Sequence, residues 1–503
     1  MRPGLRDWAE RHPERPALLM DEAARPISYA QLEARANRVA HAFAAENLAR
    51  GDHVAVLAGN GSDIVALCWA AWRSGLYLTP LPTTLALPEL RYLVDNCEAR
   101  LVVVEGAHAE IGRLLAGECP SVTVRTLGGE GAGGDWEAVL QRMPDTPRPD
   151  ETAGSLMMYS SGTTGAPKGI MRPLPGAEQH HLLPPFARDL VEIFGLDLDT
   201  RYLSTAPLYH AAALRFVLAT IAAGGFAVVM RRFDADRALA LIDAHGLTHS
   251  QWVPTMFRRL LDLPADRRTA FDGRTHRRAI HGAAPCSVAL KRAMIDWWGP
   301  VLVEYYSGSE GVGLTLIDSH EWQQRPGSVG RARKGVVHVL APDDRELGPD
   351  ETGRIFFSGL PQFHYHLDPE KTASRTSRQG WQSFGDIGHV DAGGYLYLSD
   401  RLDGMIISGG VNVYPQEIET AIEAADFILE CGVVGVPDPD FDERPVAFVV
   451  PRAGEADIVT RLRHHIERTL GRIKRPRDIH IVDALPVTPT CKLLRRKLRD
   501  MIP

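Results

Sequence analysis

Residues 159–169 read YSSGTTGAPKG, a run of hydroxyl residues and glycines that closes with a lysine. Such a loop can surround phosphate oxygens, because glycine tolerates the conformations that turn successive backbone N–H groups inward. The spacing differs from the Walker loop, G-x-x-x-x-G-K-[ST], since Pro167 stands where the second glycine belongs and Gly169 where a Mg²⁺-binding hydroxyl belongs. The stretch therefore indicates a phosphate-binding loop but not a P-loop kinase or ATPase. A flexible polar turn is the alternative.

The bulk properties favour an ordinary globular protein. The chain has 503 residues, a formal net charge of −7 and a pI near 6.3. This length suggests about three domain-sized units, and the acidic balance gives no electrostatic case for a nucleic-acid partner. The N-terminal residues resemble no secretory signal, and the longest apolar stretch, 217–230, is too short for a transmembrane segment. The six cysteines form no C-x-x-C pair, so we expect reduced thiols in a cytoplasmic protein, monomeric or homodimeric.

The order of apolar patterns predicts the fold class. Helical segments alternate with β-branched runs over residues 27–105, and again from about 190 to 325, which indicates two α/β units with parallel strands. From about residue 326, short strands with frequent Gly and Asp indicate a small β-rich unit. After about residue 400 the pattern is α+β. We therefore expect an α/β fold, with a large N-terminal domain of two α/β subdomains plus a small β-rich subdomain, followed by a small α+β C-terminal domain.

Further segments accompany the opening loop in a fixed order. They are EYYSGSEG (304–311), GWQSFGDIG (380–388), DRLDGMIISGG (400–410) and LPVTPTCKLLRRKL (485–498). Together they resemble the adenylate-forming (AMP-binding) superfamily: acyl-CoA synthetases, firefly luciferase-like enzymes and adenylation domains of peptide synthetases. The resemblance spans nearly the whole chain, from ISYAQLEARANRVA (27–40) to the final lysine motif. It implies an enzyme that activates a carboxylate with ATP as acyl-AMP, releases pyrophosphate and passes the acyl group to a thiol.

The resemblance assigns roles in nucleotide binding. The loop with Lys168 would hold the β- and γ-phosphates, Tyr306 would stack on adenine, and Ser309 would keep a hydroxyl near the α-phosphate. Asp386 would accept both ribose hydroxyls, and Arg401 would bind the ribose or a phosphate. The full set implied for ATP or AMP is Ser160, Ser161, Gly162, Thr163, Thr164, Gly165, Lys168, Gly282, Ala283, Ala284, Tyr305, Tyr306, Ser307, Ser309, Asp386 and Arg401.

Three residues are candidates for catalysis. Lys492 resembles the lysine that bridges the carboxylate and the α-phosphate, where a positioned cation stabilises the charge of the transition state. Glu310 matches the carboxylate associated with Mg²⁺, a cation that prefers hard oxygen ligands and shares them with substrate phosphates. His210 resembles the histidine that borders the acyl pocket, with a purely structural histidine as the alternative.

The second half-reaction implies a moving lobe. Residues 1–400 would form the N-terminal acyl- and ATP-binding domain, 401–403 the hinge with Asp403, and 404–503 a mobile C-terminal domain that carries the catalytic lysine. After adenylation this domain would rotate, and Ser408, Gly409 and Gly410 would approach coenzyme A. Such a rotation needs only a few residues to absorb the backbone change.

Several positions depart from the family pattern or concern the substrate. Cys491 replaces the glycine before the lysine, and His281, where glycine is usual, is placed to lie near the pocket wall. The apolar run 208–216 favours a hydrophobic acid of fatty, aryl or steroid-side-chain type that is passed to coenzyme A. Within it, Arg215 either faces outward as a solvated charge or meets a polar group on a larger acid. An acyl-AMP ligase that loads a carrier protein, and a catalytically silent acid- or nucleotide-binding relative, are the alternatives.

Overall fold

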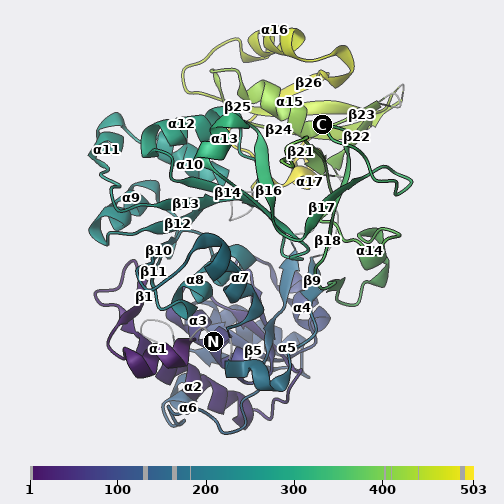
Figure 1. The fold of residues 1–503 in the computed structure, drawn as a ribbon. Coiled ribbons are helices and arrows are strands. Elements are labelled where there is room, and N and C mark those ends of the chain that lie inside the picture. Colours follow the sequence, from purple (N-terminus) through teal and green to yellow (C-terminus); the bar gives the residue numbers. More distant parts are fainter. Residues whose placement is uncertain are drawn as a thin grey trace.

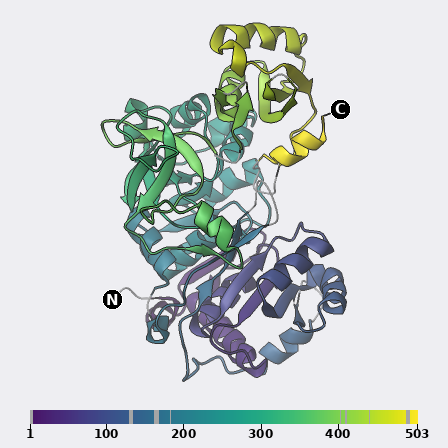
Figure 2. The ribbon, with the colours of Figure 1, turned by 90° about the vertical axis from the view of Figure 1, so that its right-hand side faces the viewer.

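The computed structural model describes residues 4–128, 134–160, 167–181, 183–401, 404–408, 411–439, 441–487 and 493–502. In Figure 1 the first α/β unit lies at the bottom, the second unit with the β-rich part lies in the middle, and the C-terminal unit lies at the top. Figure 2 shows the same order from the side. The two α/β units, the β-rich part and the α+β unit follow one another in the order that the sequence pattern predicts, except that the N-terminal strand β1 (Pro16–Met20) joins the second unit.

A five-stranded parallel sheet forms the first unit. Its strands in spatial order are β6 (Thr123–Leu127), β5 (Ala99–Glu105), β3 (His53–Leu57), β4 (Tyr77–Leu81) and β7 (Ser155–Leu156). Its helices are α2 (Tyr29–Ala45), α3 (Ser62–Arg73), α4 (Leu87–Asn96), α5 (Ala109–Glu118) and α6 (Asp135–Leu140). Along β3, Val54 and Val56 belong to the core that contains α2 and α3, whereas Ala55 and Leu57 belong to the core under α4 and α5. Helices therefore cover both faces, which explains the continuous apolar runs of the strands.

The second sheet has thirteen strands and joins a parallel half to an antiparallel half. The parallel half contains β1 (Pro16–Met20), β10 (Arg201–Ser204), β11 (Phe226–Val229), β12 (His249–Trp252), β13 (Arg278–His281) and β14 (Leu302–Tyr306). The antiparallel strands are β2 (Ile27–Ser28), which pairs with β1, and β15 (Leu314–Asp318), β16 (Ser328–Lys334), β17 (Val336–Leu340), β18 (Gly353–Ser358), β20 (Asp386–Val390) and β21 (Leu396–Arg401). The β-rich unit predicted from about residue 326 is therefore a continuation of the second sheet.

Helices pack around this second sheet, and a small third sheet borders it. The helices are α1 (Leu5–Arg11), α7 (Pro185–Phe194), α8 (Ala211–Ala222), α9 (Ala235–Ala244), α10 (Pro254–Leu261), α11 (Ala265–Ala270), α12 (Val288–Trp298), α13 (Ser319–Gln324) and α14 (Pro369–Ser374). The small sheet consists of β8 (Met158–Ser160), β9 (Lys168–Met171) and β19 (His364–Tyr365). The stretch 217–230 forms the end of α8, a turn at Gly224, which has a φ of +85°, and the buried strand β11.

The C-terminal unit has its own sheet and its own core. Its strands are β22 (Ile406–Ser408), β23 (Val411–Val413), β24 (Ile428–Asp438), β25 (Asp442–Pro451) and β26 (Asp478–Ile481). Its helices are α15 (Pro415–Glu423), α16 (Ile458–Thr469) and α17 (Arg495–Asp500). Two apolar clusters lie entirely within this unit, so it is a separate small domain after the large N-terminal one.

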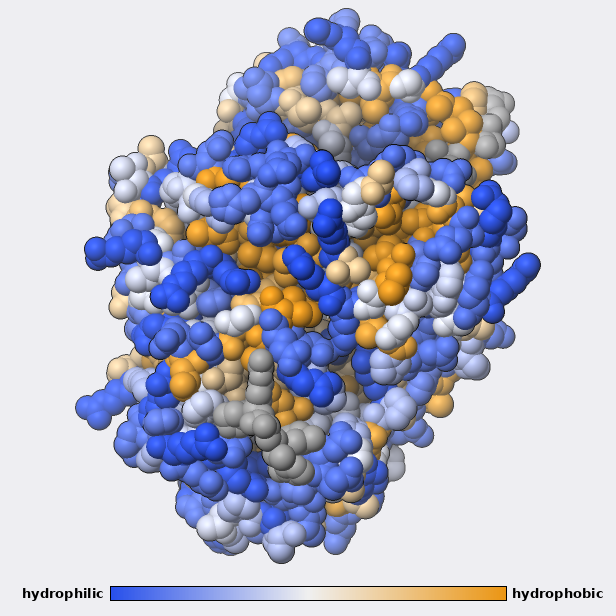
Figure 3. Space-filling view, viewed as in Figure 1, coloured by the Kyte–Doolittle hydropathy of each residue, from blue (hydrophilic) through white to orange (hydrophobic). Residues whose placement is uncertain are grey.

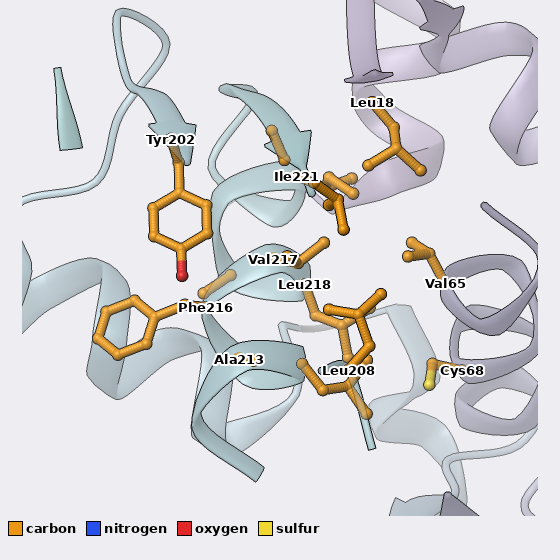
Figure 4. Close-up of a cluster of buried hydrophobic side chains, with 14 of the residues drawn as sticks. Leu18, Val65, Cys68, Tyr202, Leu208, Ala213, Phe216, Val217, Leu218 and Ile221 are labelled. Atoms are coloured by element: carbon orange, nitrogen blue, oxygen red, sulfur yellow. The ribbon is translucent and has the colours of Figure 1, made fainter. Parts of the chain in front are cut away.

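Helix α8 ties the two α/β units together. In Figure 4 its apolar residues lie between Leu18 of β1, Tyr202 of β10, and Val65 and Cys68 of α3. All these side chains belong to one continuous core that contains residues of both sheets. Since such an interior is close-packed, the position of α8 between the units is fixed.

The surface and the cysteines agree with a reduced globular protein. Hydrophilic residues cover most of the face in Figure 3, and hydrophobic residues show mainly in its central part and beneath the C-terminal domain. In the described part of the chain, no helix combines the length and the apolar character needed to cross a membrane. Cys68, Cys97, Cys119, Cys286 and Cys431 are free thiols, as the scattered spacing predicts.

Two histidines are held neutral in the core of the second sheet. His249 and His276 are each 6% exposed, and His276 Nε2 lies 2.7 Å from Ser250 Oγ. Burial lowers the pKa of His249 to about 4 and the pKa of His276 to about 3. Histidines of the unfolded chain titrate near 6.5, about their unperturbed value, so below this pH the unfolded state binds more protons. Above about pH 6.5 both states hold these histidines neutral, so the free energy of unfolding is at its full value. As the pH falls from 6.5 towards 4, only the unfolded state takes up protons, and the free energy of unfolding decreases.

We expect acidification to pH 5 to lower the free energy of unfolding by about 2 kcal/mol for each of these histidines. His276→Gln should therefore flatten the fall of Tm between pH 7.5 and pH 5. His464→Gln is the matched control, because the His464 side chain is 77% exposed and its replacement should leave the slope unchanged. Thermal unfolding followed across this pH range gives the comparison. Equal slopes in wild type and His276→Gln would contradict the assignment.

Candidate active site

Strand ends of the second sheet bring the predicted nucleotide-binding residues together. Tyr306 closes β14, Asp386 opens β20 and Arg401 closes β21. The Tyr306 hydroxyl donates a hydrogen bond of 2.6 Å to Asp386 Oδ2. Asp386 and Arg401 face each other across the antiparallel pair β20–β21, although the side chain of Arg401 is outside the description. The candidates for adenine and ribose binding therefore form one group at the carboxyl end of β14, and open α/β sheets commonly bind ligands beyond the carboxyl ends of their strands.

The two neighbouring tyrosines of β14 point in opposite directions, as successive residues of a strand do. Tyr306 is partly exposed, with its ring 5.3 Å from that of Phe384 and 6.2 Å from that of Phe357. Tyr305 lies in the core against Phe194 and Phe216, and burial raises its pKa to about 12. The Tyr305 side chain therefore supports the site from the core side, and a contact of Tyr305 with the nucleotide stays a prediction. Ser307 donates to the carbonyl of Gly313 at 2.7 Å and shapes the following turn.

The turn after β13 approaches β14 closely. A Cβ atom on Gly282 would lie 2.7 Å from the Tyr305 carbonyl oxygen, so a side chain does not fit there. Ala283 has a φ of +67°, a left-handed conformation that costs an alanine about 1 kcal/mol. Such strain clusters at ligand sites, and here it falls on the segment with Ala284 that is expected to line adenine. His281 does not line the pocket: it is fully buried with its ring 5.3 Å from Phe257.

Glu310 is held from two sides. It is 8% exposed, its Oε1 accepts a hydrogen bond of 2.8 Å from the Tyr365 hydroxyl, and its carbonyl accepts one of 2.6 Å from Arg172 Nη2. A Cβ on Gly308 would lie 2.6 Å from Glu310 Oε2, so this glycine leaves room for the carboxylate. A fixed carboxylate of this kind is a hard oxygen ligand and suits Mg²⁺ that is shared with substrate phosphates. Ser309, next to it, is partly exposed.

The phosphate loop connects two strands of the small sheet. Ser160 at the end of β8 pairs with Lys168 at the start of β9, so the loop begins and ends at one place. Lys168 forms an ion pair with Asp368, which lowers the pKa of that carboxyl. Asp368 also accepts a hydrogen bond from the Lys371 amide at the start of α14. The predicted contacts of Ser161, Gly162, Thr163, Thr164 and Gly165 lie outside the described residues.

Two residues that concern the predicted acyl pocket, His210 and Arg215, lie at the start of α8 and within it. His210 directly precedes the helix, is partly exposed and has its ring 4.6 Å from that of Tyr209. Arg215 does not face outward, because its Nε atom is buried. Burial and the positive charge of Arg172 together lower the pKa of Arg215 to about 10, against the opposing effect of Tyr305 and Glu310. The outward, solvated interpretation of Arg215 is therefore wrong. Its guanidinium lies in the interior and interacts electrostatically with groups of the candidate site.

In the C-terminal domain, Ser408 is described as a buried residue of β22, 2% exposed. The predictions for Asp403, Gly409, Gly410 and Lys492 fall outside the described residues. The domain contacts the N-terminal one through Arg258 of α10, whose Nη2 lies 3.1 Å from Glu423 Oε1 of α15. Arg258 also donates to the carbonyl of Leu429. Burial raises the pKa of Glu423, so this ion pair lies within the interface.

Sequence reasoning missed the residues that support the site. Tyr365 reaches Glu310 only because β19 pairs with β9, and Arg172 reaches the same segment from the end of β9. Neither lies in a segment that carries the family resemblance. Their positions depend on pairings between distant strands, and only a contact prediction could have identified them.

Comparison with known proteins agrees with this geometry. The profile of the AMP-binding enzyme family matches residues 5–363, and the profile of its C-terminal domain matches residues 417–492. The chain belongs to the AMP-binding enzyme family. It is 32% identical to a feruloyl-CoA synthase from an Amycolatopsis species, over 94% of this chain and 93% of that protein. It is 31% identical to the fatty acid–[acyl-carrier-protein] ligase ScoC of Streptomyces coeruleorubidus, over 98% and 94% of the two chains.

Solved structures show the same architecture. ATP-bound MatB from Rhodopseudomonas palustris superposes with a TM-score of 0.87 at 30% identity, over 99% of both chains. Apo MatB, with the same identity and coverage, superposes with a TM-score of 0.75. The enzyme is thus an AMP-forming acyl-CoA synthetase that uses ATP and coenzyme A.

Proposed function

We propose that the enzyme activates a hydrophobic carboxylic acid, of fatty, aryl or steroid-side-chain type, as acyl-AMP with release of pyrophosphate, and then transfers the acyl group to coenzyme A. The observation that carries the proposal is the bond between Tyr306 and Asp386 beside Arg401. The aromatic ring of Tyr306 suits the adenine, the carboxylate of Asp386 suits the ribose hydroxyls, and the cation Arg401 suits the ribose or a phosphate. Glu310 follows Tyr306 by a few residues along the chain.

Each of these residues has a separate role in the adenylation step. Tyr306 packs against adenine, Asp386 accepts hydrogen bonds from the ribose, and the loop with Lys168 holds the leaving pyrophosphate. Glu310 would hold Mg²⁺, which neutralises phosphate charge when bound. Lys492 stabilises the negative charge that develops as the carboxylate attacks the α-phosphorus. Because the bond between the α- and β-phosphates breaks, the loop binds the leaving group rather than a transferred phosphate.

The acid would enter beside α8. His210 precedes this helix, and the run 208–216 is apolar apart from His210 and Arg215, which supports a substrate with a hydrocarbon body. Apolar pockets with a few placed polar groups are the usual form of small-molecule sites. The relatives include ligases that use either coenzyme A or a carrier protein, so an acyl-AMP ligase that loads a carrier protein is the second candidate.

We further propose that residues 1–400 and 404–503 act as two bodies joined by a hinge at 401–403 with Asp403. In this scheme the second body delivers Lys492 for adenylation and then presents Ser408, Gly409 and Gly410 to coenzyme A. The better superposition on ATP-bound than on apo MatB supports the assignment of the present arrangement to the adenylation step. The Arg258–Glu423 ion pair would stabilise this arrangement.

Arg258→Ala is expected to slow adenylation about 5- to 30-fold, corresponding to about 1–2 kcal/mol for the lost ion pair and hydrogen bond. Transfer from supplied acyl-AMP to coenzyme A should not slow, because the contact belongs to the other arrangement. Arg259→Ala is the matched control, since Arg259 is its exposed neighbour on α10. The two half-reactions are measured separately. An equal loss in both would show that Arg258 supports the fold alone.

The overall function is tested by pyrophosphate release across a panel of fatty, aromatic and steroid-side-chain acids, with and without coenzyme A. We expect release with at least one class and consumption of free thiol when coenzyme A is present. Pyrophosphate release without thioester formation, followed by acylation of an added carrier protein, would favour the second candidate. No release with any acid would overturn the proposal.

A further inference from the structure

Helix α8 has one accessible face. Ala213, Leu214 and residues 216–222 are all buried, whereas Ala211, Ala212 and Arg215 are partly exposed. Residues three and four positions apart lie on the same side of a helix, so these three form one face on its first turns, directly after His210. Two of them are alanines, which leave space beside the long arginine side chain.

This face belongs to the candidate site and not to the outer surface. The Arg215 Nε atom is buried, and α8 packs against β14, with the ring of Phe216 6.1 Å from that of Tyr305. The groups that act electrostatically on the Arg215 guanidinium include Tyr305, Glu310 of the following turn and Arg172 after β9. Arg172 itself donates to the carbonyls of Glu310 and Gly311. Arg215 is therefore near the segment expected to carry the reacting end of the substrate, on the side where the acid would enter.

The charge of Arg215 is permanent at neutral pH, because a guanidinium does not lose its proton in proteins. The Arg172 guanidinium and the Glu310 carboxylate are among the groups that act on it electrostatically, and the Glu310 carboxylate accepts a hydrogen bond from Tyr365. Asp189 is a further carboxylate that acts on Arg172. An arginine placed in this way can bind an oxyanion through two parallel hydrogen bonds, the geometry in which arginine exceeds lysine.

We propose that Arg215 recognises a second oxyanion on the acid, so that the preferred substrates carry a carboxylate or similar group in addition to the one that is activated. This inference rests on the proposed acyl-CoA synthetase function and narrows its substrate class: the hydrocarbon body lies along the apolar residues of the pocket, and the second anionic group lies at Arg215. Arg215 is a specificity-determining residue, and the activated carboxylate is handled elsewhere in the site.

The test uses the full-length enzyme and pairs of acids that differ in one group: hexanoate against hexanedioate, and cinnamate against 4-carboxycinnamate. Pyrophosphate release gives kcat and KM for each. In at least one pair, the kcat/KM of the wild type should be at least tenfold higher for the diacid than for the matching monoacid. Arg215→Met should lower kcat/KM for that diacid about 10- to 150-fold, the range of a hydrogen-bonded charge, mainly through KM. The kcat/KM of Arg215→Met for the monoacid should change little. Arg215→Lys should restore part of the preference, and Arg259→Met should behave as wild type.

Each other outcome overturns the inference in a distinguishable way. If the wild type turns over the monoacids and shows no preference for a diacid, the proposed function stands, but the inference that Arg215 recognises a second oxyanion is contradicted. An equal loss for monoacid and diacid in Arg215→Met would mean that Arg215 acts on the reacting carboxylate or on ATP. A loss of thermal stability in Arg215→Met and Arg215→Lys alike, with an unchanged ratio between the acids, would make the residue structural. No pyrophosphate from any acid would overturn the proposed function together with the inference.

Discussion

Replacing Lys492 by alanine is expected to lower the rate of acyl-adenylate formation by about 100- to 1,000-fold, the effect of removing one group that stabilises transition-state charge. The carboxylate and the α-phosphate both carry negative charge as they approach, and a cation between them acts most strongly at that moment. Transfer of the acyl group from supplied acyl-AMP to coenzyme A should stay within a few-fold of wild type, because in the two-body scheme the lysine has by then been withdrawn.

The two half-reactions are measured separately, by pyrophosphate release and by thioester formation from synthetic acyl-AMP. Lys497→Ala is the control, because Lys497 lies in the same basic segment and is exposed on α17. Its replacement should leave both rates unchanged. Loss of both half-reactions in Lys492→Ala would contradict the rotation of the C-terminal domain. A wild-type rate of adenylation in this variant would contradict the catalytic assignment itself.

The sequence predicted best where a residue type and a local motif together carry the chemistry. Tyr306 and Asp386 were identified from their motifs, and the structure brings them within a hydrogen bond of each other. The bond itself was not predictable, because β14 and β20 meet through a sheet in which β15, β16 and β21 lie between them. The two α/β units were predicted from alternation, but their shared core around α8 was not, since periodicity describes one element at a time.

The direction of a single side chain was the least predictable feature. Helix α8 is apolar almost throughout, so its sequence gives no contrast between an inner and an outer face, and it leaves open whether Arg215 is solvated or meets a polar group of the substrate. His281 was placed near the pocket wall, yet strand alternation turns it into the core against Phe257. In both cases the direction of the side chain depends on packing against other elements, here α10 and the strands of the second sheet. The same limit applies to Tyr305, whose side chain lies in the core, whereas that of Tyr306 bonds to Asp386.

A second large effect is expected for a buried ion pair beside the site. Lys291 of α12 and Glu304 of β14 lie 2.6 Å apart, with side chains 0% and 7% exposed, and Lys291 also lies 4.8 Å from the centre of the Trp322 ring. Lys291→Met should lower the free energy of unfolding by about 3–5 kcal/mol, because it leaves a carboxylate buried without its counter-charge. Urea or thermal unfolding measures the loss.

The double variant Lys291→Met with Glu304→Gln separates this charge effect from lost packing. It should recover most of the stability, since replacing both members of a buried pair is often close to neutral whereas removing one is not. Burial raises the pKa of Glu304 and Lys291 opposes that rise, so without the lysine the carboxyl takes up a proton more readily. The deficit of the single variant relative to wild type should therefore shrink as the pH falls from 7.5 towards 5. A deficit that is independent of pH and persists in the double variant would mean that the lysine stem and its contact with Trp322 stabilise the fold, and that the charge pair contributes little.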